Sequence, residues 1–227
     1  LAVVNAASAY HVGGGFTTGG RHALEESMCV QTTLFRSLQE AVNKAERTTS
    51  RASPSYADPS RTKSGLEWQI HIPEDGVILS PGVQVFRSGY VDGYRFLSKG
   101  EVVELAVISV AMPNCNRQVR DAPCDRPPDD IAYRELLHKK FVAMLRAAAE
   151  ARVDTLIIPE AGCGVYMNAH RDVGEALGAA LAEHAPEGLA VHLVGAAAFC
   201  EAVARGAEQV LPPPPPPSPP PTTTEFR

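Results

Sequence analysis

The chain has 227 residues, of which 44% are hydrophobic, and it carries a formal net charge of −5 with a sequence pI near 5.8. This length favours one domain with appendages, and the acidic balance excludes a general binder of nucleic-acid backbones, which would show a basic stripe. The sequence has no run of eighteen apolar residues and no basic segment before a long apolar stretch, so it predicts neither a membrane span nor a signal peptide. We therefore expect a soluble intracellular protein with no direct DNA binding.

Apolar runs alternate with helical patterns along the chain. Five runs have the length and β-branched content of buried strands, at 1–7, 76–81, 102–112, 154–161 and 189–196. Four helices lie among them: one with Leu24, Met28, Leu34, Phe35 and Leu38 on its apolar face, one with Tyr133, Leu136, Leu137, Phe141, Met144 and Leu145, one starting near Asn168 with Val173, Leu177 and Leu181, and one over 196–210. This order predicts an α/β fold of three layers, with a largely parallel or mixed sheet covered by helices on both faces.

Two segments interrupt this pattern. Residues 47–65 are rich in Ser, Thr, Pro and Arg and lack periodicity, so we expect a flexible surface loop. Residues 211–227 are dominated by proline and should form a disordered or polyproline II tail. The expected domain therefore spans 1–210. Five cysteines, an odd number without zinc-site spacing, indicate reduced thiols.

Two glycine-containing loops each join a predicted strand to a predicted helix. The first runs from Asn5 to Gly20, and the second is "EAGCGVYMN", from Glu160 to Asn168. Ligands of such sheets bind outside the carboxyl ends of the strands, where helix N-termini offer backbone N–H groups to anions. Two such loops could hold a diphosphate, although tight turns alone would also explain the glycines. Neither loop matches the GKS/T phosphate loop, and no ribose-binding acid completes a dinucleotide motif.

The segment "GGGFTTGGRHALEE" resembles the signature of poly(ADP-ribose) glycohydrolases, in which three glycines and six to eight further residues precede Gln-Glu-Glu. The gap here is eight residues, and Leu24 replaces the glutamine. The opening "AVVNAAS" is similar to the first strand of macrodomains, and "GCGVYMN", "VQVFR" and "VISVAMPN" resemble the microbial-type branch. The resemblance covers residues 1 to about 207 and implies a macrodomain-like fold. Because members of this family carry helical segments before the first strand, we interpret the sequence as a fragment.

The resemblance implies roles for individual residues. Glu26 would be the general acid on the bridging ribose oxygen, and Glu25 would hold ribose hydroxyls. Adjacent helical residues point about 100° apart, so the two should have different roles. A carboxyl acts as an acid near neutral pH only if burial or a neighbouring negative charge raises its pKa, and Glu25 and a bound diphosphate would supply such charge. Without the resemblance, two acids in a first helical turn favour a solvated helix start. The remaining expected substrate-binding residues are Asn5, Gly13, Gly14, Gly15, Gly162, Cys163, Gly164, Val165 and Tyr166.

Three functions stay open at this stage. The first is cleavage of poly(ADP-ribose) with no metal and no redox cofactor, the second is recognition of ADP-ribose without cleavage, which Leu24 makes plausible, and the third is removal of mono-ADP-ribose. The partners would be poly(ADP-ribose) or ADP-ribosylated proteins, and we expect a monomer. His11 and His22 flank the glycines, but solvent-facing loop histidines are the simpler interpretation than a metal site. The N–H dipoles around Cys163 could lower its pKa, although a small packing residue is the simpler account.

Overall fold

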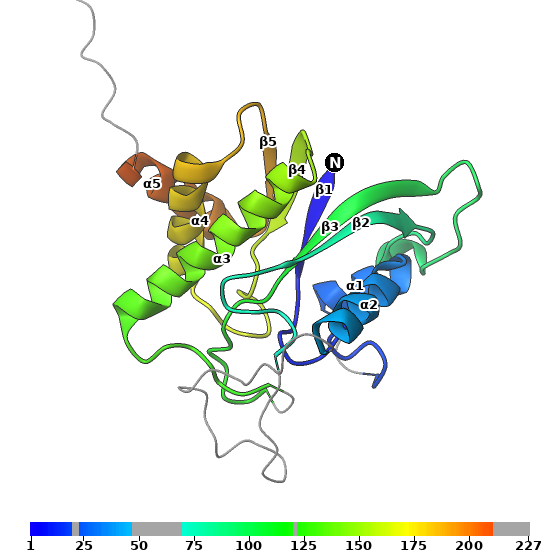
Figure 1. Ribbon diagram of the computed structural model, residues 1–227, viewed down its shortest axis with the longest axis horizontal. Helices are drawn as coiled ribbons and strands as arrows, with labels where there is room; N and C mark the ends of the chain where they lie inside the picture. The colour runs from blue at the N-terminus through cyan, green and yellow to red at the C-terminus, as the bar shows by residue number, and fades with distance from the viewer. Residues whose placement is uncertain (20–22, 47–69, 120–121, 211–227) are drawn as a thin grey trace, which may run out of the picture.

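The computed structural model describes residues 1–19, 23–46, 70–119 and 122–210. The expected loop at 47–65, the proline-rich tail at 211–227, Gly20 and His22 lie outside the described residues. Five strands form one mixed sheet in the order β2-β3-β1-β4-β5 (Figure 1). The strands are β1 (Ala2–Ala6), β2 (Ile78–Val85), β3 (Val103–Val110), β4 (Thr155–Pro159) and β5 (Ala190–Val194). Among the strand pairs of the described residues, β2–β3 is antiparallel and the other three are parallel, as the prediction of a mixed sheet allowed.

Helices lie on both faces of this sheet, which confirms the three-layer prediction (Figure 1). On one face lie α3 (Asp130–Glu150), α4 (His170–His184) and α5 (Ala197–Val210). On the other lie α1 (Leu24–Gln31) and α2 (Leu34–Glu46). Successive strand residues serve the two faces in turn. Val4 of β1 and Ile108 of β3 enter the core under α3 to α5, whereas Val107 packs with Met28 and Leu38 under α1 and α2.

The first helical segment is two helices, not the single helix that the apolar pattern predicted. Thr32 adopts an extended backbone and pairs with Val85 of β2 in an isolated bridge. Its hydroxyl donates to the carbonyl of Met28 at 2.8 Å and accepts from the N–H of Leu34 at 3.0 Å. A threonine side chain that satisfies backbone groups in this way competes with helix continuation. Leu24, the first residue of α1, is 39% exposed, so it is not buried with the rest of the predicted apolar face.

The coverage of the sheet ends before β5. Ala190, His192 and Val194 alternate on a face of β5 that none of the described helices covers, and all three are exposed. The helices on both faces of the sheet therefore leave one face of β5 exposed to solvent.

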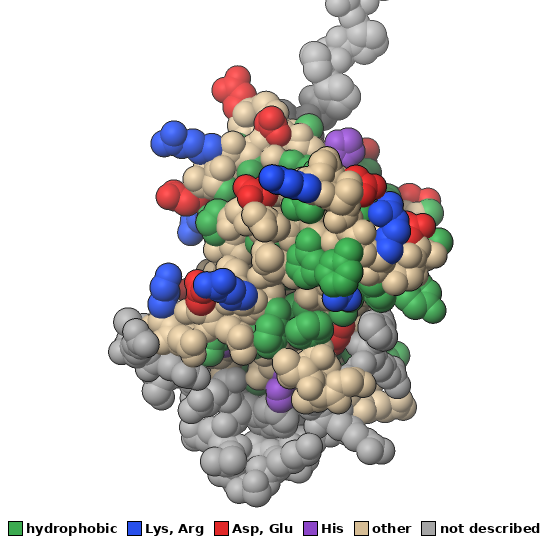
Figure 2. Space-filling view, turned by 90° about the vertical axis from the view of Figure 1, so that its right-hand side faces the viewer, with side chains coloured by type: hydrophobic (Ala, Val, Ile, Leu, Met, Phe, Trp, Pro, Cys, Tyr) green, Lys and Arg blue, Asp and Glu red, His purple; other side chains and the backbone are tan. Residues whose placement is uncertain are grey.

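Figure 2 shows the side of the molecule that carries α1, α2 and the connection between β2 and β3, where hydrophobic side chains gather at the surface. Tyr90, Val91 and Phe96 of that connection are exposed, and the guanidinium carbon of Arg87 lies 4.2 Å from the centre of the Phe96 ring. None of the described helices is long and apolar enough to cross a membrane. All five cysteines are free thiols, as expected.

Candidate active site

A cavity of about 1180 Å³ opens at the carboxyl ends of the parallel strands. This is the edge at which ligands bind in open α/β sheets. Its walls combine the first glycine loop, the start of α1, the segment after β3, the loop after β4 and the end of β5. The lining residues are Ala6, Ala7, Ser8, Gly14, Gly15, Ala23, Leu24, Glu25, Glu26, Met112, Asn116, Gln118, Val119, Pro159, Glu160, Gly162, Gly164, Val165, Tyr166, Val194 and Gly195.

Glu25 is the buried acid of this cavity, with only 3% of its surface exposed. Its Oε2 accepts a hydrogen bond from the N–H of Ser8 at 2.8 Å. Burial raises the pKa of this carboxyl to about 8, the Ser8 N–H opposes the shift, and the charge of Glu26 adds to it. Glu25 is therefore largely protonated at neutral pH.

Two buried acceptors near the end of β1 have no hydrogen-bond partner among the described residues. One is Oε1 of Glu25 and the other is Oδ1 of Asn5, whose Nδ2 donates to Ser109 at 3.0 Å. Buried polar atoms are almost always paired, and these acceptors can take hydrogen bonds from donors such as the proton of a neutral Glu25 or a group of a bound ligand. A ligand with hydroxyl groups would supply such donors.

Glu26 is half-buried and bonded to the backbone on both sides of the glycine turn. Its Oε1 accepts from the N–H of Gly15 at 2.7 Å, and its Oε2 accepts from the N–H of Ala23 at 3.1 Å. Gly14 lies between the two acids at φ +58°, and a methyl group there would come within 2.4 Å of Glu26 Oε1 and 3.3 Å of Glu25 Oε2. The two carboxyl groups thus converge on Gly14, although they belong to adjacent residues of one helix.

The loop after β4 is fixed by the buried side chain of Asn168. Its Nδ2 donates to the carbonyls of Pro113 and Gly162, both at 2.9 Å. Its Oδ1 accepts from the hydroxyl of Tyr133 at 2.7 Å and from the thiol of Cys115 at 3.3 Å. One amide therefore ties the loop to the end of β3 and to α3.

Backbone donors of this loop face the cavity. Within the described chain, the N–H groups of Gly164 and Val165 donate to no protein acceptor, and α4 begins a few residues later. Unpaired N–H groups and the positive end of a helix dipole favour an anion. Gly162 sits at φ +78°, where a methyl group would come within 2.6 Å of Met112. Only glycine fits there without distortion.

The two loops meet across the cavity. The hydroxyl of Tyr166 donates to the hydroxyl of Ser8 at 3.3 Å, which joins the loop after β4 to the loop after β1. The cavity is therefore lined both by a pair of acids, one of which has an unpartnered oxygen, and by a loop whose residues have unpaired N–H groups. This arrangement suits a ligand that carries both sugar hydroxyls and phosphates.

Comparisons with known proteins agree with this geometry. The family model of the microbial-type PARG catalytic domain matches residues 1–88. Similar solved structures include poly(ADP-ribose) glycohydrolase from Thermomonospora curvata, at 28% identity, covering 90% of this chain and 67% of that one, with a TM-score of 0.60. The enzyme from Deinococcus radiodurans in complex with ADP-ribose matches at 26% identity, covering 92% of this chain and 76% of that one, with a TM-score of 0.61. No match was found among curated proteins.

The chain is similar in fold to solved poly(ADP-ribose) glycohydrolases, and its first 88 residues match the microbial-type family model. The residues that this resemblance singled out gather largely in one place. The cavity of the glycohydrolase-like domain is lined by most of them, namely Gly14, Gly15, Glu25, Glu26, Gly162, Gly164, Val165 and Tyr166. Asn5, Gly13 and Cys163 are not among its lining residues. Asn5 lies fully buried at the end of β1, and a methyl group on Gly13 would meet Phe35 at 2.8 Å.

One expectation about the chemistry of the site needs correction. The pKa of the Cys163 thiol is raised to about 12 by burial and by the charge of Glu160, so the loop dipoles do not lower it. The thiol side packs against the main core cluster, which supports the simpler account of a small packing residue. A raised carboxyl pKa is found at Glu25, the deeper of the two acids, where burial is its main cause. His11 is exposed, as expected of a loop histidine.

Several lining residues of the glycohydrolase-like domain were missed. Asn116, Gln118 and Val119 follow β3, and Val194 and Gly195 end β5. None carries a motif. The signal that could have found them is positional, since the carboxyl ends of all parallel strands share one edge of a sheet.

Proposed function

We propose that this domain hydrolyses the ribose–ribose O-glycosidic bonds of poly(ADP-ribose) and releases ADP-ribose. The observation that carries the proposal is the convergence of two carboxyl groups, one of them protonated at neutral pH, on a glycine turn opposite a loop of unpaired N–H donors. The match to the microbial-type glycohydrolase family over the glycine and glutamate segment supports it. So does the likeness to a solved glycohydrolase in complex with ADP-ribose.

The loop after β4 would hold the diphosphate, because Gly164 and Val165 line the cavity and their N–H groups donate to no acceptor in the described chain. Tyr166 would lie against the ribose as the aromatic wall of that loop. Glu25 also lines the cavity, and its unpartnered Oε1 would form a hydrogen bond with a ribose hydroxyl. Such bonds orient the sugar and position its glycosidic bond for reaction.

Glu26 would be the proton donor. Its carboxyl lines the cavity from the first turn of α1, and Gly14 leaves room for a substrate atom to approach it closely. In the reaction the carboxyl gives its proton to the bridging oxygen as the bond from that oxygen to the anomeric carbon breaks. The anomeric carbon passes through an oxocarbenium-like transition state. Water then adds to this carbon and returns a proton to the carboxylate, so the acid is regenerated.

Glu25 supports this reaction without donating the proton itself. Because its carboxyl is largely neutral at pH 7, the buried end of the site carries little charge before the anionic substrate enters. A second buried carboxylate beside Glu26 would repel the substrate's phosphates. Its Oε2 is held by the N–H of Ser8, and its Oε1 remains available for a hydrogen bond to the sugar.

We also propose that residues 1–210 form one domain that acts on poly(ADP-ribose) or on ADP-ribosylated proteins and does not bind DNA directly. A single sheet and a continuous core that includes residues from Ala2 to Val203 support one domain. The net charge of −5 disfavours a nucleic-acid partner.

One observation favours a second candidate function. Leu24 lines the cavity with a side chain that can make no hydrogen bond, at the position where the family signature has glutamine. A domain that recognises ADP-ribose without cleaving it would tolerate this change more readily than an enzyme.

Product analysis separates the candidates. The chain is incubated with labelled poly(ADP-ribose) and, in parallel, with a mono-ADP-ribosylated protein. Release of ADP-ribose from the polymer supports the proposed hydrolase. Binding of the polymer without any product replaces it with the recognition module, and release from the mono-modified protein alone makes the domain a mono-ADP-ribosyl hydrolase.

A further inference from the structure

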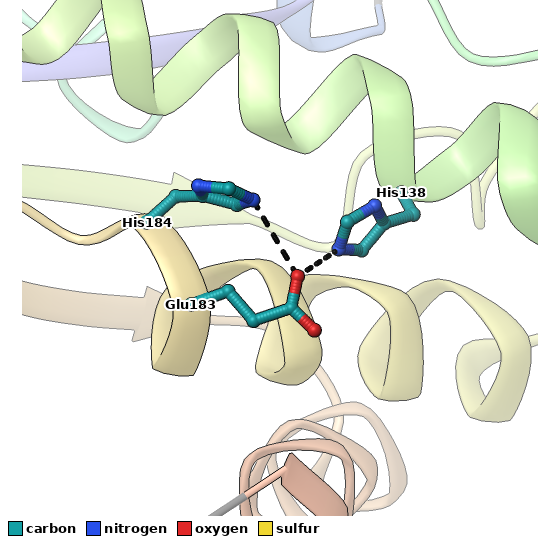
Figure 3. Close-up of side chains that lie close together, drawn as sticks. All are labelled: His138, Glu183 and His184. Carbon is teal, nitrogen blue, oxygen red and sulfur yellow. Dashed lines mark hydrogen bonds and ion pairs between the residues drawn. The ribbon is translucent and has the colours of Figure 1, made fainter.

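A cluster of two histidines and one glutamate lies between α3 and α4, on the helical layer (Figure 3). His138 belongs to α3, whereas Glu183 and His184 are the last two residues of α4. The side chains keep 32%, 37% and 41% of their surface exposed. They are thus accessible to an ion from solvent, and none is needed by the catalytic proposal.

The ligand atoms of the cluster point at one another. Nε2 of His138 lies 3.1 Å from Oε2 of Glu183, and Nε2 of His184 lies 3.4 Å from the same oxygen (Figure 3). All three atoms lie within 4.8 Å of one another. A tetrahedral zinc site with bonds of about 2.1 Å has edges of roughly 3.4 Å between ligand atoms. Two edges of the triangle therefore already match, and a small movement of the imidazole rings closes the third.

The chemistry of the three donors is selective. Two imidazole nitrogens and one carboxylate oxygen suit Zn²⁺ and its neighbours among the transition metals. Mg²⁺ and Ca²⁺ require oxygen ligands. Three protein ligands leave one tetrahedral position for water, which the partial exposure of the side chains allows.

We propose that His138, Glu183 and His184 form a binding site for a divalent transition-metal ion, with Zn²⁺ as the best fit, that fastens the end of α4 to α3. The site lies at the C-terminal end of α4, and the candidate diphosphate loop precedes its N-terminal end. A helix of fifteen residues separates the two by roughly 20 Å at about 1.5 Å per residue. The ion is therefore structural, and its binding raises stability without changing cleavage.

The test uses the full chain stripped of metal by a chelator. Co²⁺ replaces Zn²⁺ as a coloured probe in one titration, and calorimetry follows Zn²⁺ in another, with Mg²⁺ as the negative probe. The variants are His138→Gln and Glu183→Gln, and the matched control is His192→Gln, which removes an exposed histidine from β5. Circular dichroism checks that each variant folds.

We expect one ion per chain, a tetrahedral Co²⁺ spectrum without thiolate bands, and a rise in melting temperature on Zn²⁺ addition. Loss of an outer-sphere partner alone weakens metal affinity by about 10- to 100-fold, so each ligand variant should lose at least tenfold. The control should bind like the wild type. Glu183→Gln is the more informative variant, because glutamine has nearly the same shape as glutamate and can still form hydrogen bonds but carries no charge. The proposal is overturned if both ligand variants bind Zn²⁺ as tightly as the control, if no saturable binding occurs, or if thiolate bands show that cysteines hold the ion.

Discussion

The loop after β4 offers a pair of glycines that separate folding from binding. Gly162 is strained and enclosed: its φ is +78°, and an added methyl group would come within 2.6 Å of the Cβ of Met112 and 2.8 Å of Nδ2 of Asn168. Gly164 has an ordinary φ, lines the cavity, and would place a methyl group within 4 Å of no protein atom. Substitution by alanine should therefore lower the stability of the fold at Gly162 and the affinity for the ligand at Gly164.

For Gly162→Ala, the left-handed backbone costs roughly 1–2 kcal/mol and overpacking against Met112 adds roughly 1–3 kcal/mol. The sum is about 2–5 kcal/mol. At about 2–4 °C per kcal/mol for a domain of this size, the melting temperature should fall by on the order of 10 °C. For Gly164→Ala, the free energy of unfolding should change by no more than about 0.5 kcal/mol. Its methyl group instead occupies space beside the free N–H donors of the loop.

Thermal melting and calorimetry with ADP-ribose measure the two effects on the same samples. Loss of one hydrogen bond to a charged phosphate, worth about 1.5–3 kcal/mol, predicts that Gly164→Ala weakens ADP-ribose binding roughly tenfold to a hundredfold. Gly82→Ala serves as a control for backbone strain alone, because Gly82 has φ +65° on β2 with open space around it. Wild-type affinity in Gly164→Ala would refute the diphosphate role of this loop, and a wild-type melting temperature in Gly162→Ala would refute the packing that fixes it.

Three further perturbations test other parts of the site. The pKa of Glu25 is about 8 in the folded chain, against its ordinary value of 4.5. Between these pH values the folded state binds one more proton than the unfolded state, so the free energy of unfolding should fall as pH rises from about 5 to 8. Denaturant unfolding should show this slope in the wild type and not in Glu25→Gln. Asn168→Ala removes an amide with four hydrogen-bonding partners and leaves buried groups unpaired. Thermal unfolding should therefore show that the free energy of unfolding falls by roughly 2–4 kcal/mol. A fall below about 1 kcal/mol would mean that other contacts hold the loop. Leu24→Gln introduces the glutamine of the family signature at a partly exposed position. Steady-state kinetics should show faster turnover, while the affinity for ADP-ribose stays within a few-fold of the wild type. Slower turnover in this variant would contradict a role for that amide in catalysis.

The fold was largely predictable because its signals are local. The strands around Val4, Ile108 and Ile158 are apolar runs of strand length, and all of them lie in the sheet. The break at Thr32 was not predictable from periodicity, because it depends on a bridge to Val85, which lies 53 residues later in the sequence. Helical spacing carries no information about such a tertiary contact.

The site was predictable where a motif or a glycine loop marks it, as at Gly14, Glu26 and Gly164. It was not predictable where position alone brings a residue to the cavity, as for Gln118 and Val194. The difference in burial between Glu25 and Glu26 could not be predicted from the sequence either. Adjacent residues of a first helical turn are buried to different extents when another segment packs against one of them. Here Ser8, in the loop after β1, contacts Glu25.

The central claim is that Glu26 donates a proton to the glycosidic oxygen of poly(ADP-ribose), and one comparison tests it most directly. Turnover of labelled polymer and affinity for ADP-ribose are measured for the wild type and for Glu26→Gln, which keeps the shape of the side chain and removes the transferable proton. General acid catalysis is worth about 10²- to 10⁴-fold, so turnover should fall by that factor while affinity stays within a few-fold. Near-normal turnover in Glu26→Gln, or a wild-type chain that binds the polymer and never cleaves it, would contradict the account.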